Sequence, residues 1–159
     1  MLILLINGPA HSGKDHTHLV LAERFGRQVH RGKNAKLLKE RTHALYGRPD
    51  LAWDHFEGPA KDMPQALFHG LTPREAYIEV SERLLKPLHG DDIVARWFVE
   101  SLSDVEAPLV TVADVGFSAE GRRIARHAGF ANTLLLRIHD PAGRPFEGDS
   151  RGYFDIPEC

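Results

Sequence analysis

Short apolar runs alternate with longer amphipathic stretches along this chain of 159 residues. Strong runs predict buried strands at residues 2–6, 109–113 and 132–138, and a weaker one predicts a short strand near residues 28–30. Between these runs, apolar residues recur at the three- and four-residue spacing of helices. The expected helices cover residues 15–25, 34–46, 72–88, 92–102 and 119–127. Strands separated by helices predict an α/β fold with a parallel sheet flanked by helices on both faces, and a ligand at the carboxyl ends of the strands.

The pattern also predicts which faces of the first two helices are buried. In the helix over 15–25, Leu19, Val20 and Ala22 form the expected apolar stripe, and Gly26 is the expected C-cap. The helix over 34–46 has an apolar face and a basic face. Its apolar face is expected to hold Ala35, Leu38, Thr42 and Leu45, and its basic face Lys36, Lys39 and Arg41.

Turn and capping residues divide the middle of the chain. Residues 48–70 contain several Pro and Gly with no sustained period, so they predict a long irregular connection, which in a compact domain is usually functional. Thr72, Pro73 and Glu75 then form the signature of a capping box at the start of a helix. Ser118 is expected to cap the helix over 119–127.

Composition excludes several classes of protein. The net charge of −2 gives no global basic field for nucleic acid, and the only cysteine, Cys159, excludes an internal disulfide or a cysteine-based metal site. The ten histidines show no metal-ligand spacing. The first apolar run is too short for a signal sequence or a membrane span. We therefore expect one domain over residues 1–159, soluble and cytoplasmic, or in the host cytoplasm if a phage encodes it.

The first strand leads directly into a glycine-rich loop, and a helix follows the loop. Residues 8–14 match G-x-x-x-x-G-K, in which glycines let backbone N–H groups point inward and Lys14 adds a mobile positive charge. A loop of this kind between a strand and a helix holds the phosphates of ATP or GTP. The residues expected to contact the nucleotide are Gly8, His11, Ser12, Gly13, Lys14, Asp15 and His16.

Two carboxylates are candidate magnesium ligands. Asp15 stands where Ser or Thr normally supplies a hydroxyl to Mg²⁺, and a carboxylate is also a hard oxygen ligand. The alternative is that Asp15 only stabilises the positive end of the helix. Asp114 ends the strand over 109–113, the usual place of the second acid in such sites, although an aspartate there also starts turns.

Basic and aromatic residues complete the candidate chemistry. Arg144 and Arg151 lie in a Gly- and Pro-rich segment over 140–152, which is either a lid over the nucleotide or a solvated loop. The basic stretch over 24–48 either receives a phosphate or is a solvated face. Trp53, Phe56 and Tyr77 are candidates for stacking a base, and at least two of them are expected in the core.

Several motifs in order resemble the phage deoxynucleoside monophosphate kinases, a branch of the P-loop nucleoside monophosphate kinases. They are Gly13-Lys14-Asp15, Ala35-x-x-Leu38-Lys39-Glu40, Leu71-Thr72-Pro73-Arg74-Glu75-Ala76, Gly90-Asp91-Asp92, Asp114-x-Gly116-Phe117-x-x-Glu120 and Gly148-Asp149-Ser150-Arg151. The resemblance implies a P-loop three-layer sandwich, use of ATP and Mg²⁺, and phosphorylation of a deoxynucleotide. It makes Lys14, Asp114 and Arg151 catalytic, Arg144 a nucleotide contact, and residues 48–70 an insertion on the substrate side. Lys39, Arg74 and Asp92 are the substrate contacts that it implies.

Two alternatives remain open at this stage. Related phage kinases phosphorylate 5-hydroxymethyluracil within DNA, and a basic second helix suits so large a substrate. The other alternative is a P-loop ATPase or nucleotide-binding regulatory module with no acceptor except water. The sequence also leaves open whether the chain forms a homodimer.

Overall fold

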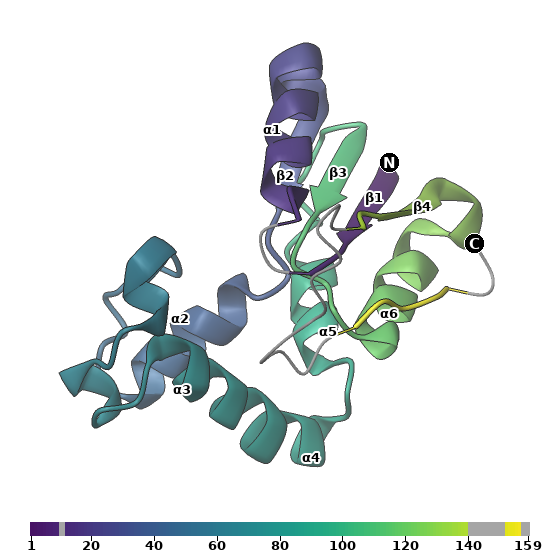
Figure 1. Ribbon diagram of the computed structural model, residues 1–159. Coiled ribbons are helices and arrows are strands. Elements are labelled where there is room, and N and C mark those ends of the chain that lie inside the picture. The colour runs from purple at the N-terminus through teal and green to yellow at the C-terminus, as the bar shows by residue number, and fades with distance from the viewer. Residues whose placement is uncertain (10–11, 140–151, 157–159) are drawn as a thin grey trace. The chain divides into compact units, whose positions relative to one another are not determined.

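The computed structural model describes residues 1–9, 12–139 and 152–156. The chain divides into two compact units, one formed by residues 1–34 and 95–159 and the other by residues 35–94. Figure 1 shows the elements of both units. Within the described ranges, no helix is long and apolar enough to cross a membrane.

The first unit is built on a parallel sheet of four strands. They are β1 (Leu2–Asn7), β2 (Val29–Gly32), β3 (Leu109–Val112) and β4 (Thr133–Arg137), in the order β2-β3-β1-β4. This confirms the predicted strands and the parallel sheet. Because β1 pairs with both β3 and β4, the loops that follow these three strands leave the same edge of the sheet side by side.

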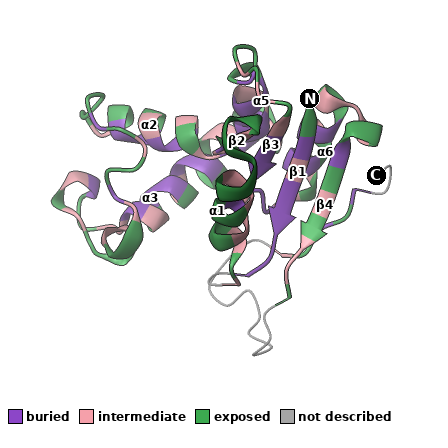
Figure 2. Cartoon of the chain, turned by 90° about the horizontal axis from the view of Figure 1, so that it is seen from above, coloured by how far each residue is buried: buried purple, intermediate pink, exposed green. Residues whose placement is uncertain are grey.

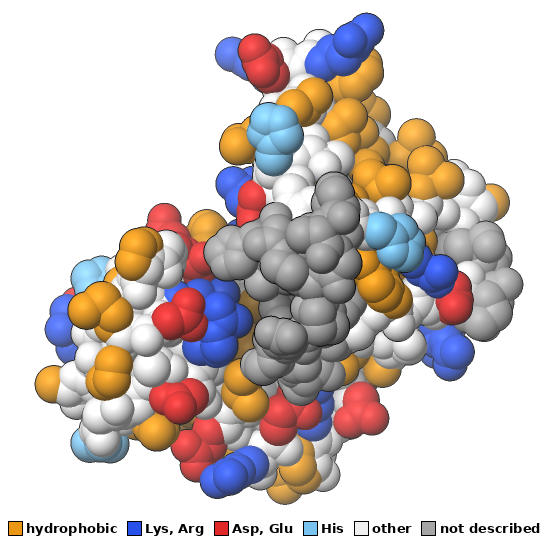
Figure 3. Space-filling view, viewed as in Figure 1, with side chains coloured by type: hydrophobic (Ala, Val, Ile, Leu, Met, Phe, Trp, Pro, Cys, Tyr) orange, Lys and Arg blue, Asp and Glu red, His pale blue; other side chains and the backbone are white. Residues whose placement is uncertain are grey.

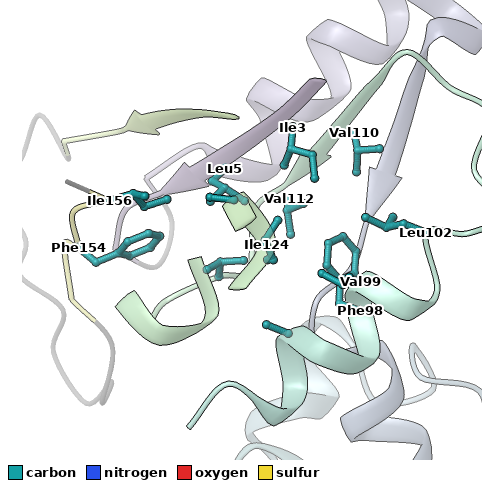
Figure 4. Packing of buried hydrophobic residues seen from close by; sticks show 13 residues of the cluster. Ile3, Leu5, Phe98, Val99, Leu102, Val110, Val112, Ile124, Phe154 and Ile156 are labelled. Atoms are coloured by element: carbon teal, nitrogen blue, oxygen red, sulfur yellow. The ribbon is translucent and has the colours of Figure 1, made fainter. Parts of the chain in front are cut away.

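Helices cover both faces of this sheet. Helix α1 (Lys14–Phe25) lies on one face, and α5 (Ile93–Glu100) and α6 (Ser118–Ala128) lie on the other, as Figure 2 shows. The larger core is on the side of α5 and α6. Figure 4 shows how it packs. Its fully buried members include Ile3, Leu5, Val110, Val112 and Ile124. The described helices and sheet therefore form the predicted layers.

Two predictions about these helices are wrong in detail. Leu19 and Val20 were expected to be buried, but they are 56% and 46% exposed, and His18 is the buried residue of α1. Figure 3 shows hydrophobic side chains at the surface in the region of α1. Ser118 is the first residue of α6 rather than its cap, because the N-cap position falls on Phe117 and no side chain caps it. The predicted end of α1 at Gly26 is confirmed.

The second unit is mainly helical. It contains α2 (Lys36–Leu45), α3 (Pro73–Glu79), a π-helical segment (Val80–Leu85) and α4 (Lys86–His89). Its core contains Leu51, Phe56, Phe68, Ala76 and Tyr77. Residues 48–70 form the predicted irregular connection, with two short 3₁₀ turns. Leu45 was expected on the buried face of α2 but is 61% exposed, because α2 packs through Leu38, Thr42 and His43 instead.

The long helical stretch of this unit begins at a capping box and changes to the π form where its sequence requires. The side chain of Thr72 accepts a hydrogen bond from the Glu75 N–H, and the Glu75 carboxylate accepts one from the Thr72 N–H. The predicted capping box is therefore confirmed. Pro87 has no N–H to donate to the preceding turn, and the helix widens to the π form just before it.

Candidate functional site

The loop after β1 is built around two glycines. A Cβ on Gly8 would lie 2.6 Å from the Ile138 carbonyl oxygen and 2.7 Å from Ser12 Oγ, so only glycine fits there. Gly13 has φ of 92°, in the left-handed region, and forms the N-cap of α1. The Ser12 N–H donates to the Pro9 carbonyl at 3.3 Å, which turns the chain back on itself. This strand, tight loop and helix are the arrangement that the sequence predicts for a phosphate site.

Lys14 points back over this loop. Its Nζ donates to the Gly8 carbonyl at 2.7 Å and also to the Pro9 carbonyl. The ammonium group thus lies at the loop, where it adds to the positive end of the α1 dipole. Ser12 Oγ is buried and has no hydrogen-bond partner among the described residues. A lysine over a glycine loop and an unsatisfied hydroxyl below it are features that a bound phosphate would use.

Asp15, in the first turn of α1, forms an ion pair across to β2. Its Oδ1 accepts from Arg31 Nη2 at 2.6 Å, and the two side chains are 65% and 41% exposed. The neighbouring His16 is exposed. The position of Asp15 agrees with both predicted roles, a metal ligand and a stabiliser of the helix N-terminus.

Asp114 lies beside the same segment of chain. It follows β3, and its Oδ1 accepts from the backbone N–H of Asn34 at 3.0 Å. Asp15 and Asp114 therefore both contact residues 31–34, Asp15 at Arg31 and Asp114 at Asn34. Within the described ranges no group of three His, Cys, Asp or Glu side chains has the arrangement of a metal site. Magnesium commonly takes only one or two carboxylates and completes its shell with water and phosphate.

His18 links α1 to the sheet below this region. It is 4% exposed, and its Nδ1 forms a hydrogen bond with Thr111 Oγ1. Burial lowers the pKa of His18, and the positive charge of Arg31 lowers it further. A neutral His18 therefore anchors the start of α1 on β3, which helps to fix the loop that precedes the helix.

The residue before the loop also holds the two flanks of segment 140–151. The Asn7 carbonyl accepts from the Ile138 N–H at 2.8 Å, and the Asn7 side chain donates to the Gly152 carbonyl at 3.2 Å. Arg137 donates to the Phe154 carbonyl at 2.9 Å and 3.1 Å. Arg144, Arg151 and His11 themselves lie outside the described residues.

The predicted substrate contacts Lys39, Arg74 and Asp92 lie in the second unit. The structure differs from the prediction in the burial of Lys39. Lys39 was expected on a basic face that either receives a phosphate or is solvated; the solvated alternative is wrong for Lys39, because its side chain is only 7% exposed and pairs with Glu57. Its Nζ lies 5.2 Å from the centre of the Trp53 ring and 5.9 Å from that of Tyr77. Tyr77 and Phe56 are in the core, as predicted for two of the three aromatic residues, and Trp53 is partly exposed.

Arg74 and Asp92 are placed differently from Lys39. Arg74 Nε donates to Asp62 Oδ1 at 2.6 Å, so it pairs with a different carboxylate, and its side chain is 35% exposed. Asp92 is partly buried directly before α5. Lys39 and Arg74 therefore belong to two separate ion pairs.

A buried hydrogen-bonded pair supports this unit from inside. His43 is fully buried, with Nε2 at 2.8 Å from the Tyr77 hydroxyl and Nδ1 at 3.2 Å from the Leu51 carbonyl oxygen. Burial lowers the pKa of His43 and raises that of Tyr77. Both groups are therefore uncharged near neutral pH and serve to order the core around Lys39.

Arg31, Asn34 and Asn7 are the residues that sequence reasoning missed. Arg31 was only one member of a basic stretch, Asn34 was only the first residue of a predicted helix, and Asn7 lay between the predicted strand and the predicted loop. Their partners Asp15, Asp114 and Gly152 are 16, 80 and 145 residues away along the chain. No known protein family matches this chain, and no curated protein is detectably similar to it.

Proposed function

We propose that this protein is a P-loop kinase that transfers the γ-phosphoryl group of ATP to a deoxynucleoside monophosphate in the presence of Mg²⁺. One observation carries the proposal: β1 leads through a loop that only glycine fits at Gly8 into α1, with Lys14 folded over that loop. The positive end of the α1 dipole and the Lys14 ammonium group are both suited to an anion.

The two carboxylates fit the magnesium ion that such transfer requires. Asp15 and Asp114 supply hard oxygen ligands and lie at opposite ends of residues 31–34. A magnesium ion there would neutralise charge on the transferred phosphoryl group. Before nucleotide binds, Arg31 and the Asn34 N–H already hold these two side chains in place.

The anchored flanks of segment 140–151 support a role for its arginines. Ile138 and Gly152 both hydrogen-bond to Asn7, the residue that directly precedes the loop. In the sequence, Arg151 directly precedes Gly152. We propose that Arg144 and Arg151 stabilise the charge that develops during phosphoryl transfer, as arginines do in other phosphoryl-transfer enzymes.

The burial of Lys39 favours a free monophosphate over DNA as the acceptor. A DNA-binding face needs several basic side chains that reach backbone phosphates together. Lys39, in the middle of the basic helix α2, is instead buried and neutralised by Glu57. Arg74 is more exposed, and we propose that it binds the acceptor phosphate.

The test is transfer from labelled ATP to a panel of deoxynucleoside monophosphates and to duplex DNA that contains 5-hydroxymethyluracil. We expect labelled diphosphate from at least one monophosphate, with a shallow dependence on salt. Transfer to the modified DNA alone, with a steep salt dependence, would identify a DNA kinase instead. ATP hydrolysis that no acceptor changes would identify an ATPase.

A matched pair of variants tests the acceptor site. Arg74→Gln should raise the KM for the acceptor, because it removes the cation proposed to bind the acceptor phosphate. Arg83→Gln is the control, since Arg83 is 79% exposed and forms an i,i+4 pair with Glu79 in the same unit. Equal effects of the two substitutions would exclude a specific role for Arg74.

A further inference from the structure

We propose that Arg31 is an exchangeable counterion of Asp15, which Asp15 releases when it turns to the divalent cation that accompanies the nucleotide. Arg31 would then set how strongly nucleotide binding depends on metal. This inference rests on the proposed function, because it concerns the same phosphate site. No sequence motif pointed to Arg31, and the ion pair across to α1 is what identifies it.

The geometry makes Arg31 the direct competitor of a metal for Asp15. Arg31 lies on β2 in register with Thr111 of β3, and its Nη2 reaches Asp15 Oδ1 at 2.6 Å. A cation that binds the same carboxylate oxygen must displace the guanidinium group or share the carboxylate with it. Because the two side chains are 41% and 65% exposed, water can solvate each of them once they separate.

The ion pair between Arg31 and Asp15 neutralises an unusual negative charge next to the loop. Asp15 replaces the neutral hydroxyl that normally follows the lysine of such loops, so it adds a negative charge beside the site of the phosphates. Arg31 cancels that charge while no metal is present. When a metal binds, its own charge replaces that of Arg31. The strength of an exposed ion pair corresponds to at most about a fivefold change in an equilibrium constant, so this exchange is easily reversed.

The proposed exchange does not disturb the hydrogen bond that holds Asp114. Asp114 is bound by the backbone N–H of Asn34, not by the Arg31 side chain. Asn34 is 2% exposed, and its Oδ1 is buried with no hydrogen-bond partner among the described residues. Substitution of Arg31 therefore removes the partner of Asp15 and leaves the hydrogen bond that holds Asp114 in place.

The experiment measures binding rather than turnover. Calorimetry gives the affinity for ADP in the presence of EDTA, and a Mg²⁺ titration at saturating ADP gives the half-saturating metal concentration, both at constant ionic strength. Arg31→Ala should weaken metal-free ADP binding about two- to fivefold and lower the half-saturating Mg²⁺ concentration about two- to fivefold. For both quantities, Arg31→Lys should give a value between those of Arg31→Ala and the original protein.

Two further variants make the result decisive. Arg27→Ala removes the same charge from the same unit but just before β2, at the opposite edge of the sheet, and should change neither value. Asp15→Asn should weaken the Mg²⁺ dependence, and adding Arg31→Ala to it should cause no further change in that dependence.

The outcomes separate this inference from the proposed function. If the original protein binds ADP but Arg31→Ala changes both affinities in the same direction, or neither, the exchange is wrong and the phosphate site stands. An additive effect of Arg31→Ala in the Asp15→Asn background would also overturn the exchange. If the original protein binds no ADP with or without metal, the proposed function fails and this inference fails with it.

Discussion

The substitution Gly8→Ala tests whether the loop after β1 is as tightly built as the structure indicates. The new methyl group would lie 2.6 Å from the Ile138 carbonyl oxygen and 2.7 Å from Ser12 Oγ, both closer than a Cβ can approach. The Ile138 carbonyl belongs to the backbone and cannot rotate away as a side chain does. It is also held by the Tyr153 hydroxyl at 3.1 Å, while the Ile138 N–H donates to Asn7 at 2.8 Å.

The loop must therefore move, and the cost follows from the physics of overpacking. Forcing one methyl group into a closely packed site costs about 1–3 kcal/mol. For a chain of this length, that corresponds to a fall in Tm of roughly 2–12 °C. Displacement of the loop should also weaken MgADP binding at least tenfold, because it shifts the start of α1 and the Lys14 ammonium group that we propose bind the phosphates.

Differential scanning fluorimetry and calorimetry measure the two effects of Gly8→Ala. Gly152→Ala is the matched control, because a Cβ there meets no described residue within 4 Å and the same methyl group should change neither quantity. A Gly8→Ala protein with the original Tm and the original affinity for MgADP would show that the loop does not have this geometry, and the phosphate site derived from it would be wrong.

Three other predictions concern stability. Thr72→Ala removes the capping box with Glu75 and should cost about 1 kcal/mol in urea unfolding, whereas a loss below about 0.3 kcal/mol would contradict the cap. Glu57→Gln should destabilise the protein more than Lys39→Met, because it leaves a buried ammonium group without its carboxylate, and the reverse order would show that Lys39 is solvated. The pKa of His18 in the folded protein is below its ordinary value of 6.5. As the pH falls below 6.5, the unfolded chain therefore binds a proton at His18 more readily than the folded chain, and the free energy of unfolding decreases. His18→Asn should reduce the fall in Tm between pH 7 and pH 5, and an unchanged pH profile would refute this.

Much of the fold was predictable because local sequence determines it. The strands β1, β3 and β4 are short apolar runs, and Gly26 and the Thr72 capping box mark helix ends by rules that involve only neighbouring residues. The glycine loop was also predictable, since its spacing and its position after a strand define it.

The errors come from packing between distant residues. Periodicity shows that α1 is a helix but not which side contacts the sheet, and the partner of His18 is Thr111, 93 residues away. The burial of Lys39 depends on Glu57, which lies in an irregular segment whose path the sequence does not specify. The Arg31 pair with Asp15 was missed for the same reason, because an ion pair between a strand and a helix leaves no periodic signal.

The most direct test of the central claim is phosphoryl transfer by Lys14→Ala. Lys14 is the cation that the described loop itself supplies, and its Nζ lies at the carbonyls of Gly8 and Pro9. The account predicts a loss on the order of a hundredfold or more in kcat for the deoxynucleoside monophosphate that the original protein uses best, with Tm within a few degrees of the original. A folded Lys14→Ala protein that transfers phosphate at nearly the original rate would contradict the assignment of this loop as the phosphate site.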